Sequence, residues 1–115
     1  MAKLRIGGKD FPLLTTVGVL DQMALKGYTV KDLPQFLHGK ELSWEESIDN
    51  CVEFLLMVME AGQLAAMIRD GAELLALPEG DTLRNLLTPQ QLSGLCDAAI
   101  VDSLYRTVEA EPGKN

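Results

Sequence analysis

The chain has few of the residues on which metal-binding, catalytic and disulfide-linked proteins depend. It contains one histidine, His38, and two cysteines, Cys51 and Cys96, which lie far apart in the sequence. A structural metal site requires several Cys or His residues at short spacings, and a nucleophile relay requires a base beside a Ser or Cys. We therefore expect no enzyme, no bound metal and no cofactor.

Aromatic residues and basic clusters are also scarce. Aromatics make up 5% of the 115 residues, so the core must be aliphatic, and 17 acidic residues outweigh 10 basic ones to give a net charge of −7. Affinity for nucleic acid depends on Lys and Arg that neutralise phosphates, and anionic lipid heads likewise attract basic segments. The composition predicts neither a nucleic-acid partner nor a membrane partner.

No apolar run approaches the roughly 20 residues that span a bilayer. The longest, Phe54–Met59, lies between Glu53 and Glu60, and residues 1–8 include no apolar stretch of the kind found in a signal peptide. The two cysteines lie among apolar neighbours, which is typical of small buried side chains rather than of a disulfide framework. These features predict a cytoplasmic protein.

Length and an apolar content of 47% indicate one domain, expected over residues 1–110, with a polar tail at 111–115. Residues 3–14 predict a β-hairpin, because apolar residues two apart flank the glycine-rich turn Gly7–Asp10. The rest of the chain has helical periodicity. We expect a mainly α fold of about five helices with a short N-terminal hairpin.

Two segments have strong helix-start signals. Ser43–Glu46 and Thr88–Gln91 each place a hydroxyl residue three positions before Glu or Gln, the pattern of a capping box. Thr16 is expected to cap an earlier helix that stops at Gly27.

Two shorter helices are also expected. One ends at Gly39, and its cap is Thr29 or Asp32; Pro34 favours Asp32, because proline fits the first turn of a helix. The other is expected to begin with Asp81 as its cap.

The central helix follows Ser43 and carries an apolar run, Phe54–Met59, that covers more than one face. Gly62 is expected to interrupt or kink it. Beyond Gly62, a helical stripe is predicted to continue as far as Pro78. The residues of that stripe are Leu64, Ala65, Ile68, Ala72 and Leu75.

An apolar run on every side of a helix is either enclosed in a core or partly used as an interface. Methionine adapts its shape to apolar guests, so the methionines of this region indicate a protein-binding surface that also allows self-association. The alternative is that they belong to an ordinary core. The candidate surface is Phe54, Met57, Val58, Met59 and Met67.

Two further residues have a functional and a structural interpretation. His38 precedes Gly39 at a helix end, where a favourable interaction with the helix dipole is a better explanation than catalysis. Asp102-Ser103-Leu104 matches the tripeptide on which acyl carrier proteins attach phosphopantetheine. In that family the serine opens a helix, whereas Ser103 falls well inside the last predicted helix, which favours a chance match.

The order of elements, taken with certain short segments, resembles the tail assembly chaperones of long-tailed bacteriophages and prophages of Gram-positive hosts. The similarity covers nearly the whole chain, although none of its motifs is chemically diagnostic. The segments that carry it are the strand pair around Ile6–Leu13, Gly27–Leu33 opening a short helix, Leu55-Leu56 and Met59–Gly62 in the apolar helix, and Leu86–Leu92 opening the last helix.

This resemblance implies a chaperone that binds the long apolar tape measure protein and helps the tail tube protein to assemble around it. It also implies a longer form made by ribosomal slippage, for which suitable codons of Pro112–Lys114 would provide a slippery heptamer. Two alternatives remain, a bacterial adaptor or regulatory module without a phage role, and an acyl-carrier-like protein that uses Ser103. The genomic neighbourhood distinguishes the first alternative from the chaperone.

Overall fold

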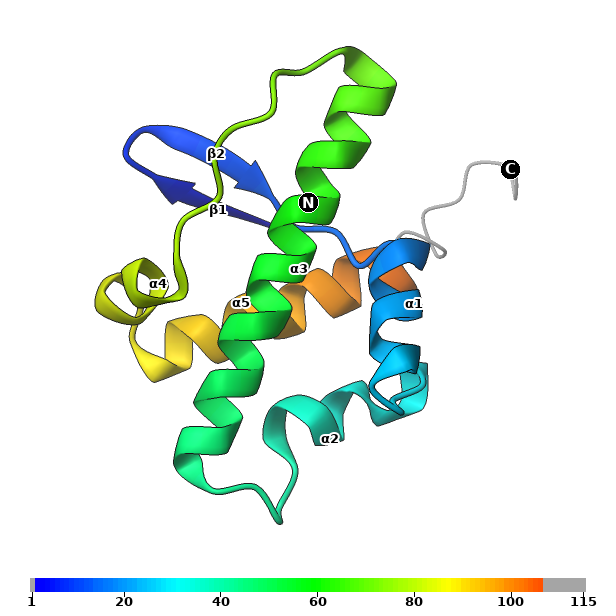
Figure 1. Cartoon of the computed structure of the whole chain (residues 1–115), viewed down its shortest axis with the longest axis vertical. Helices are drawn as coiled ribbons and strands as arrows, with labels where there is room; N and C mark the ends of the chain where they lie inside the picture. Colours follow the sequence, from blue (N-terminus) through cyan, green and yellow to red (C-terminus); the bar gives the residue numbers. More distant parts are fainter. Residues whose placement is uncertain (1, 107–115) are drawn as a thin grey trace.

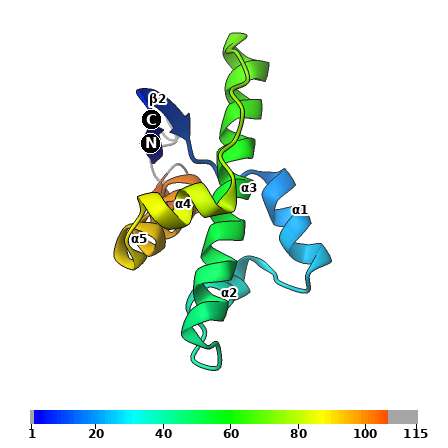
Figure 2. The same cartoon turned by 60° about the vertical axis from the view of Figure 1, so that its left-hand side comes forward.

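The computed structural model describes residues 2–106, and one long helix runs through their middle (Figure 1). The elements are β1 Lys3–Ile6, β2 Lys9–Pro12, α1 Val17–Leu25, the 3₁₀ turn η1 Val30–Asp32, α2 Leu33–His38, α3 Trp44–Asp70, α4 Gly80–Leu86, α5 Pro89–Val101 and the π-helical segment η2 Asp102–Arg106. The predicted fold class is confirmed. In the view of Figure 1, α1 and α2 lie to the right of α3, and the hairpin and α4 lie to its left; Figure 2 shows α1 and the hairpin on opposite sides of α3.

The hairpin packs on the helices through one apolar pair. Leu4 of β1 lies opposite Phe11 of β2, and both side chains are buried. The turn contains only Gly7 and Gly8, with φ angles of 57° and 79°, the left-handed values that a two-residue turn of this kind requires. The predicted four-residue turn is therefore wrong, because its second half, residues 9–10, belongs to β2.

Three predicted helix starts are confirmed. Ser43 accepts a hydrogen bond of 3.0 Å from the main-chain N–H of Glu46, whose carboxylate accepts one of 2.8 Å from the main-chain N–H of Ser43. Thr88 and Gln91 form the same reciprocal pair at the start of α5, and the side chain of Thr16 caps α1. Each pair satisfies main-chain donors that a helix start leaves without partners.

Of the two candidate caps of the helix that ends at Gly39, Thr29 caps η1 and Asp32 occupies the cap position of α2, as predicted. The predicted cap of the later short helix, Asp81, is wrong. The Asp32 carboxylate accepts hydrogen bonds of 3.0 Å from both the main-chain N–H and the hydroxyl of Thr29, so the helical turn begins at Thr29 and runs through η1 into α2. These hydrogen bonds lower the pKa of the Asp32 carboxyl. Glu79 rather than Asp81 occupies the cap position of α4, and Asp81 complements the helix dipole from the first turn.

α3 continues without a break through Gly62, where an interruption was predicted. Gly62 serves a close approach to β2: a Cβ atom placed on it would stand 1.9 Å from the carbonyl oxygen of Pro12. The helix ends at Gly71, which has a left-handed φ of 68°. Ala72 and Leu75 therefore lie in the following loop, and the prediction that they extend the helical stripe is wrong.

Gln63 attaches this loop, residues 71–79, to α3. The side-chain amide of Gln63 donates a hydrogen bond of 2.8 Å to the carbonyl of Leu75 and accepts one of 2.5 Å from its main-chain N–H. Because both groups of the amide have a partner, burying this polar side chain costs little. Leu75 and Leu77 pack partly buried against the core.

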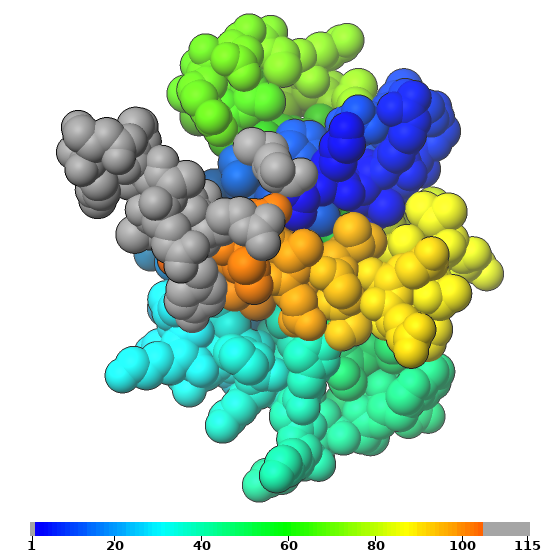
Figure 3. Space-filling model, turned by 180° about the vertical axis from the view of Figure 1, so that it is seen from behind, coloured from blue at the N-terminus to red at the C-terminus, as the bar shows by residue number. Residues whose placement is uncertain are grey.

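The core is mostly aliphatic, as predicted, but it also contains all three phenylalanines, Phe11, Phe36 and Phe54. α3 contributes the largest share of it. On the face opposite to that of Figure 1, α5 crosses the molecule between the hairpin and α2 (Figure 3). The polar tail predicted at 111–115 lies outside the described residues. The buried residues of α3 are Cys51, Val52, Phe54, Leu55, Val58, Met59, Ala61, Gly62 and Gln63.

Candidate functional site

The predicted binding surface divides into core and surface residues. Phe54, Val58 and Met59 are completely buried, so the prediction is wrong for these three. The reason is that β2, α1, α2, α4 and α5 all contact α3 and enclose its middle turns. Met57 is partly buried, and Met67, further along α3, is exposed.

Met57 lines a hollow of about 240 Å³ between α1 and the second half of α3, which we name the α1–α3 groove. α1 and α3 contribute facing walls, and most of the lining side chains are apolar or small. The lining residues are Thr16, Gly18, Val19, Gln22, Met57, Glu60, Ala61, Leu64, Ala65 and Ile68.

Large apolar side chains continue from the groove onto the surface. Both Ile68, which is 79% exposed, and Leu64, which is 41% exposed, belong to α3 and line the groove. The last turns of α3 extend past both α1 and the hairpin, and the loop 71–79 runs back along one side of them (Figures 1 and 2). Single exposed apolar residues are ordinary, but a hollow surrounded by several of them indicates a binding site.

Small residues create the groove. Gly18 has no side chain, and a Cβ atom on it would meet only the Thr16 hydroxyl, at 3.6 Å. Ala61 and Ala65 face it from α3. Because none of these three residues fills the space between the two helices, the groove stays open to an apolar side chain from outside.

The groove residues of α1 were missed by the sequence analysis. The core side of α1 is formed by Val19 and Met23, which are buried. Val17 and Leu25 lie off that side, and both are exposed. Neither of them lines the groove, so the sequence offered no direct signal for this wall.

A second apolar hollow of about 250 Å³ lies at the other end of α3. It includes Trp44, the only tryptophan, which is largely exposed. One wall is Arg84, whose guanidinium pairs with Asp49. The lining residues are Trp44, Ile48, Arg84, Leu87, Pro89 and Leu92.

His38 lies in a surface polar cluster at the end of α2. Its Nε2 atom is 3.1 Å from a carboxylate oxygen of Asp97 and 3.4 Å from the hydroxyl of Ser93. A Ser–His–Asp relay needs the acid and the nucleophile on different ring nitrogens. Here both approach the same nitrogen, so the cluster has the geometry of a surface ion pair and not that of a relay.

The two cysteines meet in the core, where both are buried and unbridged. The Cys96 thiol donates a hydrogen bond of 3.3 Å to the carbonyl oxygen of Cys51. A hydrogen bond from Cys96 and, more weakly, the charge of His38 lower the pKa of the Cys51 thiol to about 7, while the same thiol pairing and burial raise the pKa of Cys96. Reactive cysteines are partly exposed, and these are not. Within residues 2–106, no group of three side chains suits a metal ion.

Ser103, the residue of the carrier-like tripeptide, is half-buried in η2. Its hydroxyl oxygen accepts a hydrogen bond of 2.9 Å from the main-chain N–H of Thr15, and the Thr15 hydroxyl donates one of 3.1 Å to the carbonyl of Ala99. These bonds attach the end of α5 to the connection between β2 and α1. The serine hydroxyl thus has a structural partner.

This arrangement yields a first prediction. Co-expression with a promiscuous phosphopantetheinyl transferase should leave the mass of the protein unchanged, because the Ser103 hydroxyl is engaged and half-buried. Intact-protein mass spectrometry measures the outcome. A mass gain equal to the phosphopantetheine group, absent from Ser103→Ala, would establish the carrier interpretation.

α3 is long and apolar enough to cross a membrane by length and composition, although half of its most apolar window is buried inside the fold, as in the core helix of a globular domain. Comparisons of the chain with protein-family models, with curated proteins and with solved structures found no match.

Proposed function

We propose that this chain is a protein-binding chaperone of phage tail assembly, and that the α1–α3 groove receives an apolar helical segment of the tape measure protein. The observation that supports the proposal most is the open apolar hollow, continued by the exposed side chains of Leu64 and Ile68. The resemblance in the order of elements points to the same class of protein.

The energetics suit transient binding. Full burial of a Leu or Ile side chain contributes about 1.5–3 kcal/mol to the free energy of binding. An amphipathic helix places such side chains into a groove at spacings of three and four residues. Two or three of them would hold an aggregation-prone segment in solution and would still release it when tail tube subunits arrive.

Co-expression with the product of the longest open reading frame nearby in the genome tests the assignment. A chaperone of this class should co-purify with that protein and keep it soluble. If the neighbourhood holds no such reading frame while the groove still binds apolar helices, the adaptor alternative becomes the better explanation.

A second prediction concerns the groove itself. Ile68→Asp should weaken binding of an apolar helical guest at least tenfold, because it places a charge where the guest buries its side chains. The free energy of unfolding should hardly change, since Ile68 is 79% exposed. Isothermal titration calorimetry and thermal unfolding measure the two effects.

Leu86→Asp is the matched control, since Leu86 is also exposed but lies on α4, away from the groove. It should leave guest binding unchanged. Equal loss of binding in both variants would move the site away from the α1–α3 groove.

A further inference from the structure

One flank of α3 carries two glutamates, about two helical turns apart, in different electrostatic settings. The first, Glu53, forms an ion pair of 2.6 Å with Lys26, which follows α1. The second, Glu60, lines the α1–α3 groove and is exposed. Among residues 2–106, no basic side chain lies within ion-pair distance of Glu60. The groove thus carries an unneutralised negative charge beside an apolar hollow.

The walls of the groove favour a helical occupant over an extended one. Both walls are α-helices, whose main-chain groups are already hydrogen-bonded within each helix. An extended peptide would find no strand edge there to pair with and would leave its own N–H and C=O groups without partners. A helix satisfies these groups internally and offers only side chains to the groove.

The charge of the chain determines which helix fits. With a net charge of −7, a second copy of this protein would be repelled. A guest with Lys or Arg beside its apolar face would be attracted and would neutralise Glu60.

We infer that the α1–α3 groove takes a basic amphipathic helix, whose apolar face enters the hollow and whose Lys or Arg pairs with Glu60 as Lys26 pairs with Glu53. This inference rests on the proposed function and adds the charge pattern of the guest. The glutamate selects among apolar helices, since a helix with acidic flanks would meet the same hollow and be repelled.

Three synthetic helical peptides test the inference. They share one apolar face of Leu and Ile and differ only in the residues that flank it, which are Lys, Gln or Glu. We expect the Lys peptide to bind most tightly and the Glu peptide least tightly in 50 mM salt. An exposed ion pair changes affinity by up to about fivefold, and this difference should shrink as salt is added.

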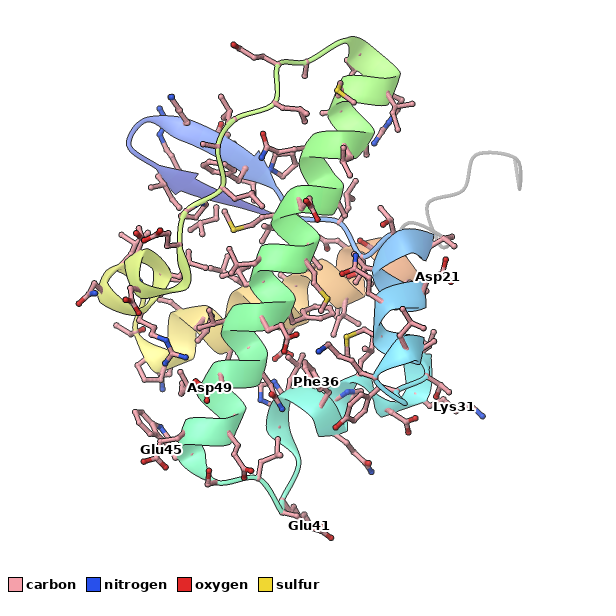
Figure 4. All side chains as sticks on the ribbon, in the orientation of Figure 1. Asp21, Lys31, Phe36, Glu41, Glu45 and Asp49 are labelled. Atoms are coloured by element: carbon pink, nitrogen blue, oxygen red, sulfur yellow. The ribbon has the colours of Figure 1, made fainter. Side chains whose placement is uncertain are left out.

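Charge reversal in the protein provides the matched comparison. Glu60→Lys should weaken the binding of the Lys peptide about fivefold and should strengthen the binding of the Glu peptide. Glu41→Lys makes the same change in net charge, but Glu41 lies in the loop before α3, at the opposite end of the molecule from the groove (Figure 4). That control should change each affinity less than twofold.

The outcomes separate the inference from the proposed function. If none of the peptides binds, the inference and the proposed function both fail. If all three bind equally and Glu60→Lys changes nothing, the groove still receives helices but the charge selection is wrong. If the protein alone dimerises in sedimentation equilibrium and Ile68→Asp dissociates the dimer, the occupant is a second copy and the inference is overturned.

Discussion

Gly62→Ala is expected to destabilise the protein by about 3 kcal/mol or more, or to prevent folding. The added Cβ would stand 1.9 Å from the carbonyl oxygen of Pro12 and 2.6 Å from its carbonyl carbon. Main-chain atoms cannot rotate away as the tip of a side chain can. β2 and α3 would therefore have to separate, which would also strain the hydrogen bond from the N–H of Leu14 to the carbonyl of Val58.

Gly94→Ala is the matched control. Gly94 lies inside α5 and is exposed, and a Cβ atom on it would meet nothing within 4 Å. Alanine there should raise the free energy of unfolding by about 0.5–1 kcal/mol, because it is the better helix former. Urea unfolding of both variants measures the two changes in the free energy of unfolding, which should have opposite signs. A Gly62→Ala protein as stable as the wild type would contradict the packing of β2 on α3.

The helix starts could be predicted because their physical causes are local. A capping box is complete within four residues, so Ser43 with Glu46 and Thr88 with Gln91 are recognisable without any knowledge of the fold. The same holds for Thr29 and Asp32, the two candidate caps of the next helix: Thr29 caps η1 and Asp32 occupies the cap position of α2. The carboxylate of Asp32 also accepts a hydrogen bond from the main-chain N–H of Thr29.

The role of Gly62 and the division of α3 into core and surface depend on distant parts of the chain. A glycine in a helical pattern predicts a weak point in the helix. Only the position of Pro12 reveals that Gly62 allows β2 to approach α3 closely. Periodicity likewise groups Met59 with Ile68 as apolar helix residues. The elements packed around the middle of α3 bury Met59, and the absence of such cover leaves Ile68 exposed.

The groove was predictable only in outline. The excess of apolar residues around α3 indicated a binding surface there, and Met57 does line the groove. Its other wall is α1, which is docked by the burial of Val19 and Met23 and by the ion pair between Lys26 and Glu53. These contacts join residues far apart in the sequence, so no local pattern in a single sequence encodes them.

Leu55→Asp should abolish folding. Leu55 is completely buried on α3, so the variant would place a carboxylate in an aliphatic core with no cation to pair with. Burying an unpaired charge costs several kcal/mol even after the surroundings relax. A domain of this size has a total stability of about 5–15 kcal/mol. We expect insoluble protein, or soluble protein without a cooperative thermal transition in circular dichroism.

Ile68→Asp makes the same change on the same helix, at a side chain that is 79% exposed. It should keep a melting temperature within a few degrees of the wild type, since substitutions at such sites cost about 0.5 kcal/mol or less. The pair of variants thus tests two different positions of α3: at Leu55 the charge should remove the fold, and at Ile68 it should remove only the binding that we propose for the groove. Loss of the fold in both, or in neither, would contradict the assignment of these two positions to core and groove.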